Sequence, residues 1–268
     1  MEYPAYRFGI STTIDYSVDI FTQLELINKA GFEFISIGAR LEHSCFMEPS
    51  FFDKVMERAA DYEIEIESAH APFGGEYDLA AKSLAEREKA VELTREFCEV
   101  AADYAISTVI VHPHHFFDDS QEACAGRAAG GLERLLATSP PEIKIAVENL
   151  PDHRGSWICG RLLDIFGPSR LGFCYDSSHE NMSGPAFHIL RKYRDRIVTT
   201  HLSDNHGSED EHLAPGEGRI DWGELSELIK ESGVRSILFE VGTGEKLREP
   251  IETVLKQTIE FADKQFNK

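Results

Sequence analysis

Basic charge is scarce in this sequence. Its 268 residues include 27 lysines and arginines against 47 aspartates and glutamates, which gives a formal net charge of −20 at pH 7. Proteins that bind nucleic acids usually present a basic surface, because contacts with phosphates dominate their affinity. The field of so acidic a chain repels polyanions. We therefore expect a small-molecule substrate rather than a nucleic acid.

Long apolar runs and paired cysteines are also missing. No stretch approaches the about 20 apolar residues of a membrane span, and the first residues lack the basic start and apolar run of a signal peptide. We therefore expect a cytoplasmic protein without a membrane partner, whose oligomeric state the sequence leaves open. No CxxC motif is present, which favours reduced and mostly buried thiols. The five cysteines are Cys45, Cys98, Cys124, Cys159 and Cys174.

Short apolar runs typical of strands alternate with amphipathic helical patterns along the whole chain. This alternation predicts a parallel sheet, and eight strand–helix units without a Pro-, Gly- or Ser-rich linker favour one (β/α)8 TIM barrel over residues 1–268. The alternative is a doubly wound open sheet, but no GxGxxG motif follows the first strand. The expected strands cover residues 8–13, 33–38, 64–70, 108–112, 143–148, 171–175, 197–202 and 236–240.

Several helix ends have local signals. Asp221 followed by Glu224 is an acidic variant of the capping box and predicts a helix start. Gly233 and Gly31 are expected to end helices in the left-handed conformation. The last helix carries apolar side chains on one face at helical spacing, namely Ile251, Val254, Leu255, Ile259, Ala262 and Phe266.

Carboxylates and imidazoles stand where the apolar runs end, and these groups are common ligands of divalent metals. In a TIM barrel the active site lies at the C-terminal ends of the strands, so these side chains should converge on one rim. Glu148 is the most telling, because an unpaired carboxylate at the end of an apolar strand is costly to bury. The expected rim residues are Glu148, Asp176, Asp210, Glu240, His70, His112, His179, His201 and His212.

The other histidines have less specific signals. His114 and His115 lie in the loop that follows His112 and are expected to line the mouth of the site. His188 falls within a helix and is expected to be structural. Either a substrate contact or a solvated loop position suits each of His43, His153 and His206.

The order His, His, Glu, Asp-x-x-His, His, Asp-x-His-x-x-x-Gly-x-Gly, Glu runs over the whole chain. It resembles the xylose-isomerase-like TIM-barrel superfamily. That superfamily includes sugar and sugar-phosphate isomerases and epimerases, and also AP endonucleases of the endonuclease IV type. The stretch HLSDNHGSEDEHLAPGEGRIDW is especially similar to the isomerase/epimerase branch.

The resemblance implies two alternative metal sites. In isomerases and epimerases one divalent ion is held by residues that match Glu148, Asp176, His201 and Glu240, and the two glutamates exchange protons with the substrate carbon. In the AP endonucleases three zinc ions are bound. The additional ligands there match His70, His112, His179, Asp210 and His212, all of which are present.

The leading hypothesis is a divalent-metal-dependent sugar or sugar-phosphate isomerase or epimerase that acts through an enediolate. Mn²⁺, Mg²⁺ or Co²⁺ suits the carboxylate-rich quartet, and the added histidines also suit Zn²⁺. Arg154 or Arg219 is expected to bind a phosphate or carboxylate of the substrate, and His114 to contact it. The alternative is a zinc-dependent phosphodiesterase like the AP endonucleases. The number of possible metal ligands favours that alternative. The net charge disfavours it, and so does the loop GARLEHSCF after the second strand, which has one arginine where the nucleases have a basic, polar loop.

Overall fold

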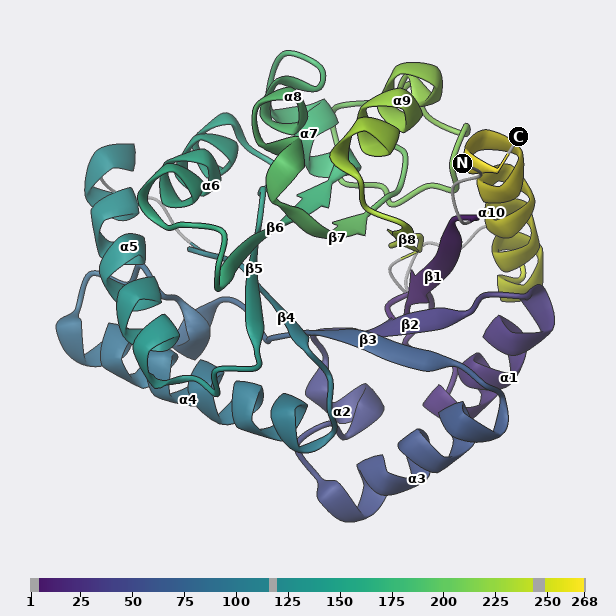
Figure 1. The fold of residues 1–268 in the computed structure, drawn as a ribbon, viewed down its shortest axis with the longest axis horizontal. Coiled ribbons are helices and arrows are strands. Elements are labelled where there is room, and N and C mark those ends of the chain that lie inside the picture. The colour runs from purple at the N-terminus through teal and green to yellow at the C-terminus, as the bar shows by residue number, and fades with distance from the viewer. Residues whose placement is uncertain (1–4, 116–119, 243–248, 268) are drawn as a thin grey trace.

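Eight parallel strands form a nearly closed barrel inside a ring of helices, which confirms the predicted (β/α)8 TIM barrel (Figure 1). The computed structural model describes residues 5–115, 120–242 and 249–267. The predicted strands are all present, with ends displaced by one or two residues. They are β1 (Arg7–Ser11), β2 (Phe34–Ile37), β3 (Glu65–His70), β4 (Thr108–Val111), β5 (Lys144–Glu148), β6 (Leu171–Asp176), β7 (Ile197–His201) and β8 (Ser236–Phe239).

The strands are hydrogen-bonded in the order β7-β6-β5-β4-β3-β2-β1-β8. The ends of this sheet meet where β7 and β8 approach one another. The amide of Leu202 donates to the carbonyl oxygen of Leu238, and the amide of Glu240 donates to that of Leu202, both at 3.0 Å. The Thr200 hydroxyl also bonds to the backbone of Leu238. This closure brings the end of β8 beside the end of β7.

Helices cover the outside of the barrel and connect successive strands (Figure 1). Among the described residues, none of these helices combines the length and the hydropathy needed to cross a membrane. The α-helices are α1 (Ile20–Ala30), α2 (Leu41–Ser44), α3 (Pro49–Asp61), α4 (Leu84–Asp103), α5 (Gln121–Thr138), α6 (His153–Ile165), α7 (Ser177–Ser183), α8 (His188–Tyr193), α9 (Trp222–Ser232) and α10 (Ile251–Phe266). Two 3₁₀ turns are η1 (Gly75–Tyr77) and η2 (Arg194–Arg196).

The predicted helix ends are confirmed. The side chain of Asp221 accepts a hydrogen bond from the amide of Glu224 at 3.1 Å, so Asp221 caps the start of α9. Gly31 ends α1 with φ of 94°, and Gly233 ends α9 with φ of 84°. Only glycine adopts such left-handed angles without steric cost.

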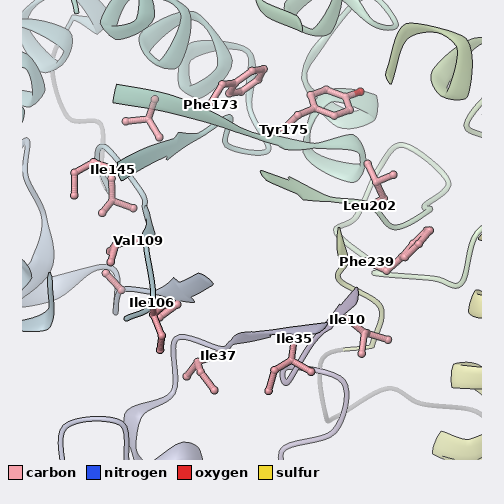
Figure 2. Packing of buried hydrophobic residues seen from close by; sticks show 14 of the residues in the cluster. Ile10, Ile35, Ile37, Ile106, Val109, Ile145, Phe173, Tyr175, Leu202 and Phe239 are labelled. Atoms are coloured by element: carbon pink, nitrogen blue, oxygen red, sulfur yellow. The ribbon is translucent and has the colours of Figure 1, made fainter. Parts of the chain in front are cut away.

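The main hydrophobic core lies between the barrel and its helices. Figure 2 shows side chains such as Ile10, Ile35, Ile145 and Phe173 on the outer face of the strands. All of them are buried, and they pack against the apolar faces of the surrounding helices. On α10 the predicted face is buried at five positions, and Ile259 is partly buried. Burial of this layer fixes the strands and thereby the positions of the side chains at their ends.

Candidate metal centre

The alternation of side chains along each strand explains why the strands end on metal-ligand residues. Ala146 and Cys174 belong to a small buried cluster separate from the main core, as expected for residues that face the barrel interior. Side chains two residues apart lie on the same face of a strand. Glu148 follows Ala146 and Asp176 follows Cys174 at this spacing. The residues at or next to the C-terminal ends of β3 to β7 are His70, His112, Glu148, Asp176 and His201.

Glu148 lies at the centre of the site and is 1% exposed. One of its oxygens, Oε2, lies 3.3 Å from Nε2 of His70, 3.6 Å from Nε2 of His112 and 3.2 Å from Nδ1 of His201. The other oxygen, Oε1, lies 3.1 Å from Nδ1 of His179. Four imidazoles, three at or next to strand ends and that of His179 on α7, therefore surround one carboxylate.

The predicted quartet is assembled. One ligand atom from each of Glu148, Asp176, His201 and Glu240 lies within 4.8 Å of the others, and all four residues are buried. Within the described part of the chain, both ring nitrogens of His201 and Oδ2 of Asp176 lack a hydrogen-bond partner, although Nδ1 of His201 is only 3.1 Å from Oε2 of Glu240. Buried polar atoms without a partner are costly. A divalent cation among them would satisfy these atoms, so the residues fit a metal site.

Among the described residues, further ligand groups adjoin the quartet; one adds Cys174 to Glu148 and His201, and two others contain the remaining rim residues. The first of these two consists of His70, His112 and Glu148, so that Glu148 belongs to both this group and the quartet. In the second, Oδ2 of Asp210 lies 3.2 Å from Nε2 of His179 and 3.0 Å from Nε2 of His212. Oδ1 of Asp210 is buried and has no hydrogen-bond partner among the residues that the structure describes. All nine residues expected at the rim are thus brought together.

Backbone carbonyls fix the orientation of three site histidines. A carbonyl oxygen can only accept, so the Nδ1 atom beside it must carry the proton, and the neutral ring then presents the Nε2 lone pair to the site. Metal-ligating histidines commonly have this arrangement. The three bonds run from His70 to Ala71 (2.7 Å), from His179 to Asn149 (2.8 Å) and from His212 to Glu240 (2.9 Å).

The charges of the site are strongly interdependent. Burial alone would raise the pKa of Glu148, but the imidazoles of His201 and His112 lower it well below its usual range. Burial is likewise outweighed at Glu240, where His201 lowers the pKa to about 2. At Asp176 burial prevails and raises the pKa to about 7. Carboxylates and imidazoles thus compete for a few protons. A bound divalent cation would balance the negative charge of the carboxylates in place of those protons.

The loop between β7 and α9 is held by the buried carboxylate of Asp204. Its Oδ2 accepts from the amide of Gly216 (3.0 Å) and from Nε1 of Trp222 (2.8 Å), and its Oδ1 accepts from the amide of Ile220 (3.1 Å). A Cβ at Gly218 would lie 2.2 Å from Oδ1, so only glycine fits there. This network accounts for Asp204, the Gly-x-Gly and Trp222 in the stretch HLSDNHGSEDEHLAPGEGRIDW, and it positions the loop that carries Asp210 and His212.

A cavity of about 440 Å³ opens above the ligand groups at the C-terminal ends of the strands. Asp176 and His201 are buried and do not belong to its lining. His114, expected at the mouth, is part of the lining. The ligand residues that line it are His70, His112, Glu148, His179, Asp210, His212 and Glu240.

Several residues of the lining were not identified from the sequence, among them Tyr16, Arg40 and Phe73. Phe73 is 48% exposed and stacks on His112 with ring centroids 4.1 Å apart. Burial raises the pKa of Tyr16, and the nearby charge of Glu240 raises it further, so its hydroxyl stays protonated. Each lies in a loop after a strand, which is the one signal that could have indicated them.

The two arginines expected to bind the substrate lie elsewhere. Arg154 is exposed in the first turn of α6, and Arg219 is exposed in the loop before α9. The guanidinium of Arg219 lies against Gly207, where it occupies the space of a Cβ. Neither arginine belongs to the residues that line the cavity.

Other histidines have structural or surface positions. Nε2 of His43 lies 2.9 Å from the carbonyl oxygen of Val18, and Nδ1 of the exposed His206 lies 2.9 Å from a carboxylate oxygen of Glu211. His153 and His188 are exposed on helices, at the starts of α6 and α8.

Known proteins share this architecture. Residues 24–265 match the family model described as xylose isomerase-like TIM barrel. The uncharacterized protein MJ1311 of Methanocaldococcus jannaschii is 29% identical over 87% of this chain and 82% of its own length. A probable endonuclease 4 of Mycobacterium bovis is 29% identical over 66% of this chain and 73% of its own. The crystal structure of a D-tagatose 3-epimerase-like protein superimposes with a TM-score of 0.83 at 24% identity, over 97% of both chains.

Proposed function

Since the chain belongs to the xylose isomerase-like TIM barrel family, we propose that it is a divalent-metal-dependent isomerase or epimerase of a sugar or sugar phosphate. The observation that supports this proposal most directly is the quartet Glu148, Asp176, His201 and Glu240 beside a cavity of about 440 Å³. A cavity of this size suits a small molecule. The net charge of −20 also favours a small substrate over a polyanion.

The quartet would hold the ion, and its carboxylate-rich composition suits Mn²⁺, Mg²⁺ or Co²⁺, with Zn²⁺ as a further candidate. When bound, such an ion would polarise the substrate carbonyl and stabilise the negative charge that develops on the substrate oxygens.

Glu148 and Glu240 would transfer the proton. They extend from β5 and β8, which are not neighbours in the sheet, so their carboxylates approach the cavity from different directions. Both have a pKa lowered below its usual range by His201, and are therefore ionised at neutral pH, the state in which a carboxylate accepts a proton. One would remove the proton from the carbon next to the carbonyl, and the other would return it.

A second candidate function is the hydrolysis of a small phosphate ester or diester. The observation that favours it is the sharing of Glu148 between the quartet and the group His70, His112 and Glu148. With four imidazoles within 3.1–3.6 Å, Glu148 has the surroundings of a ligand that bridges metals rather than those of a free base. Several divalent ions would together stabilise the charge on a phosphoryl group. The similarity to a probable endonuclease 4 supports the same candidate.

Proton exchange tests the first proposal. Metal-loaded protein is incubated in D₂O with ketoses and their phosphates, and deuterium incorporation is followed by NMR. Glu148→Gln and Glu240→Gln keep the side-chain shape but remove the proton acceptor, so exchange should fall by about 100-fold or more. Glu142→Gln, an exposed glutamate just before β5 at the far end of the barrel, is the matched control and should exchange like the wild type.

Two results would contradict the proposal. Undiminished exchange in both single variants would show that neither carboxylate handles the proton. A wild type that exchanges none of these substrates but cleaves bis(p-nitrophenyl) phosphate in the presence of metal would establish the second candidate instead.

A further inference from the structure

Arg40 has an unusual position in the cavity. Among the described residues that line it, Arg40 is the only lysine or arginine. The same lining contains four carboxylates, Glu148, Asp152, Asp210 and Glu240. A neutral sugar requires no cation in such a cavity, whereas a phosphate or carboxylate group would be repelled unless a positive charge stood beside it.

An aromatic platform holds this guanidinium. Cζ of Arg40 lies 4.4 Å from the ring centroid of Tyr16. The Tyr16 ring in turn packs edge-on against His43, with centroids 5.2 Å apart, and Nε2 of His43 lies 2.9 Å from the carbonyl oxygen of Val18. Stacking uses the face of a guanidinium, while its in-plane N–H groups are those that bind oxyanions in bidentate fashion. The contact with Tyr16 therefore holds the guanidinium of Arg40 at the wall of the cavity.

The strand order places Arg40 across the barrel from three members of the quartet, Glu148, Asp176 and His201. Arg40 follows β2, which lies four strands from β6 in either direction around the ring. Asp176 ends β6, Glu148 and His201 end the strands on either side of it, and Glu240 follows β8, which lies two strands from both β6 and β2. In Figure 1, β2 and β6 lie on opposite sides of the barrel. A ligand whose oxygens meet the quartet can thus extend its far end towards Arg40.

We propose that Arg40, stacked on Tyr16, binds the anionic group of the substrate, which makes a phosphorylated or carboxylated sugar the substrate class of this enzyme. This assignment rests on the proposed isomerase or epimerase function. The role of binding a phosphate or carboxylate, which the sequence predicted for Arg154 or Arg219, is thereby assigned to Arg40.

Binding measurements test the assignment without requiring turnover. Mn²⁺-loaded protein is titrated in a calorimeter with a ketohexose, with its 6-phosphate, with the analogue that has a carboxylate at carbon 6, and with inorganic phosphate. The wild type should bind one anionic sugar about tenfold more tightly than the neutral one, and comparison of the two anionic sugars identifies phosphate or carboxylate as the group. Arg40→Gln should lose this preference and keep its affinity for the neutral sugar.

The matched control is Arg161→Gln. Arg161 is an exposed arginine on α6 whose Cζ lies 5.9 Å from the Trp157 ring, and it is outside the cavity. Its variant should retain the anionic preference. A wild type that binds neutral and anionic sugars equally, or binds none of the anions, would overturn the assignment. So would an Arg40→Gln variant that keeps the preference.

The outcomes also separate this assignment from the proposed function. Preference for an anionic sugar that depends on Arg40, without deuterium exchange into any sugar, would retain the anion site and refute the isomerase. Exchange into neutral and anionic sugars alike, unchanged in Arg40→Gln, would retain the isomerase and refute the anion site.

Discussion

Replacement of Asp204 by asparagine should destabilise the protein strongly, although the two side chains have nearly the same shape. Each carboxylate oxygen accepts two hydrogen bonds, Oδ1 from the amides of Asn205 and Ile220 and Oδ2 from the amide of Gly216 and the indole of Trp222. In either orientation, the side-chain NH₂ group of an asparagine would face two N–H donors and could accept from neither. Because Asp204 is 0% exposed, water cannot take over the lost bonds.

The size of the effect follows from these contacts. A hydrogen bond to a charged group contributes about 1.5–3 kcal/mol, so the loss of two amounts to about 3–6 kcal/mol. For a protein of this length that corresponds to a melting temperature lower by roughly 6–24 °C. Urea unfolding measures the free energy, and hydrogen exchange of the Gly216 and Ile220 amides shows whether the loop between β7 and α9 opens.

Asp221→Asn is the matched control for this loop. Asp221 accepts one hydrogen bond, from the amide of Glu224, at the start of α9. Asparagine caps helices about as well as aspartate, so the loss should stay below about 0.5 kcal/mol. The reasoning would be refuted if Asp204→Asn lost less than about 1 kcal/mol, or if amide exchange in the loop were unchanged.

Two predictions concern the metal. Purified protein should hold at least one tightly bound divalent ion per chain, and chelation should lower its melting temperature, because a free ion concentration of 100 times the dissociation constant stabilises the folded state by about 2.7 kcal/mol. Metal analysis and thermal melts check this. A protein that neither binds Mn²⁺ or Zn²⁺ nor is stabilised by them contradicts it. His212→Ala should raise KM and leave the number of bound ions unchanged if only the quartet holds metal. Loss of one ion from three, together with loss of phosphodiester cleavage, would instead support the second candidate function.

Local sequence patterns were sufficient to predict the barrel architecture. Strand alternation, helical periodicity and capping residues act over a few neighbouring positions, so the sequence shows them directly. The Asp221 cap of α9 and the left-handed Gly31 after α1 are such signals, and the structure has both. The nine rim residues were also accessible, because parallel strands in a barrel present their C-terminal ends at one face.

The relative placement of side chains required the tertiary structure. Arg154 and Arg219 stand near ligand residues in the sequence, yet both are exposed and outside the cavity lining. Arg40 is far from Glu148 along the chain and reaches the same cavity because β2 lies across the barrel from β6.

The sequence by itself determined which residues stand at the strand ends, since that depends on short-range periodicity. Only the tertiary structure decided that Glu148 belongs to more than one ligand group and that backbone carbonyls orient His70, His179 and His212. Those relations depend on distances between strands that are remote in sequence. Closure of the barrel sets these distances, and no local pattern encodes them.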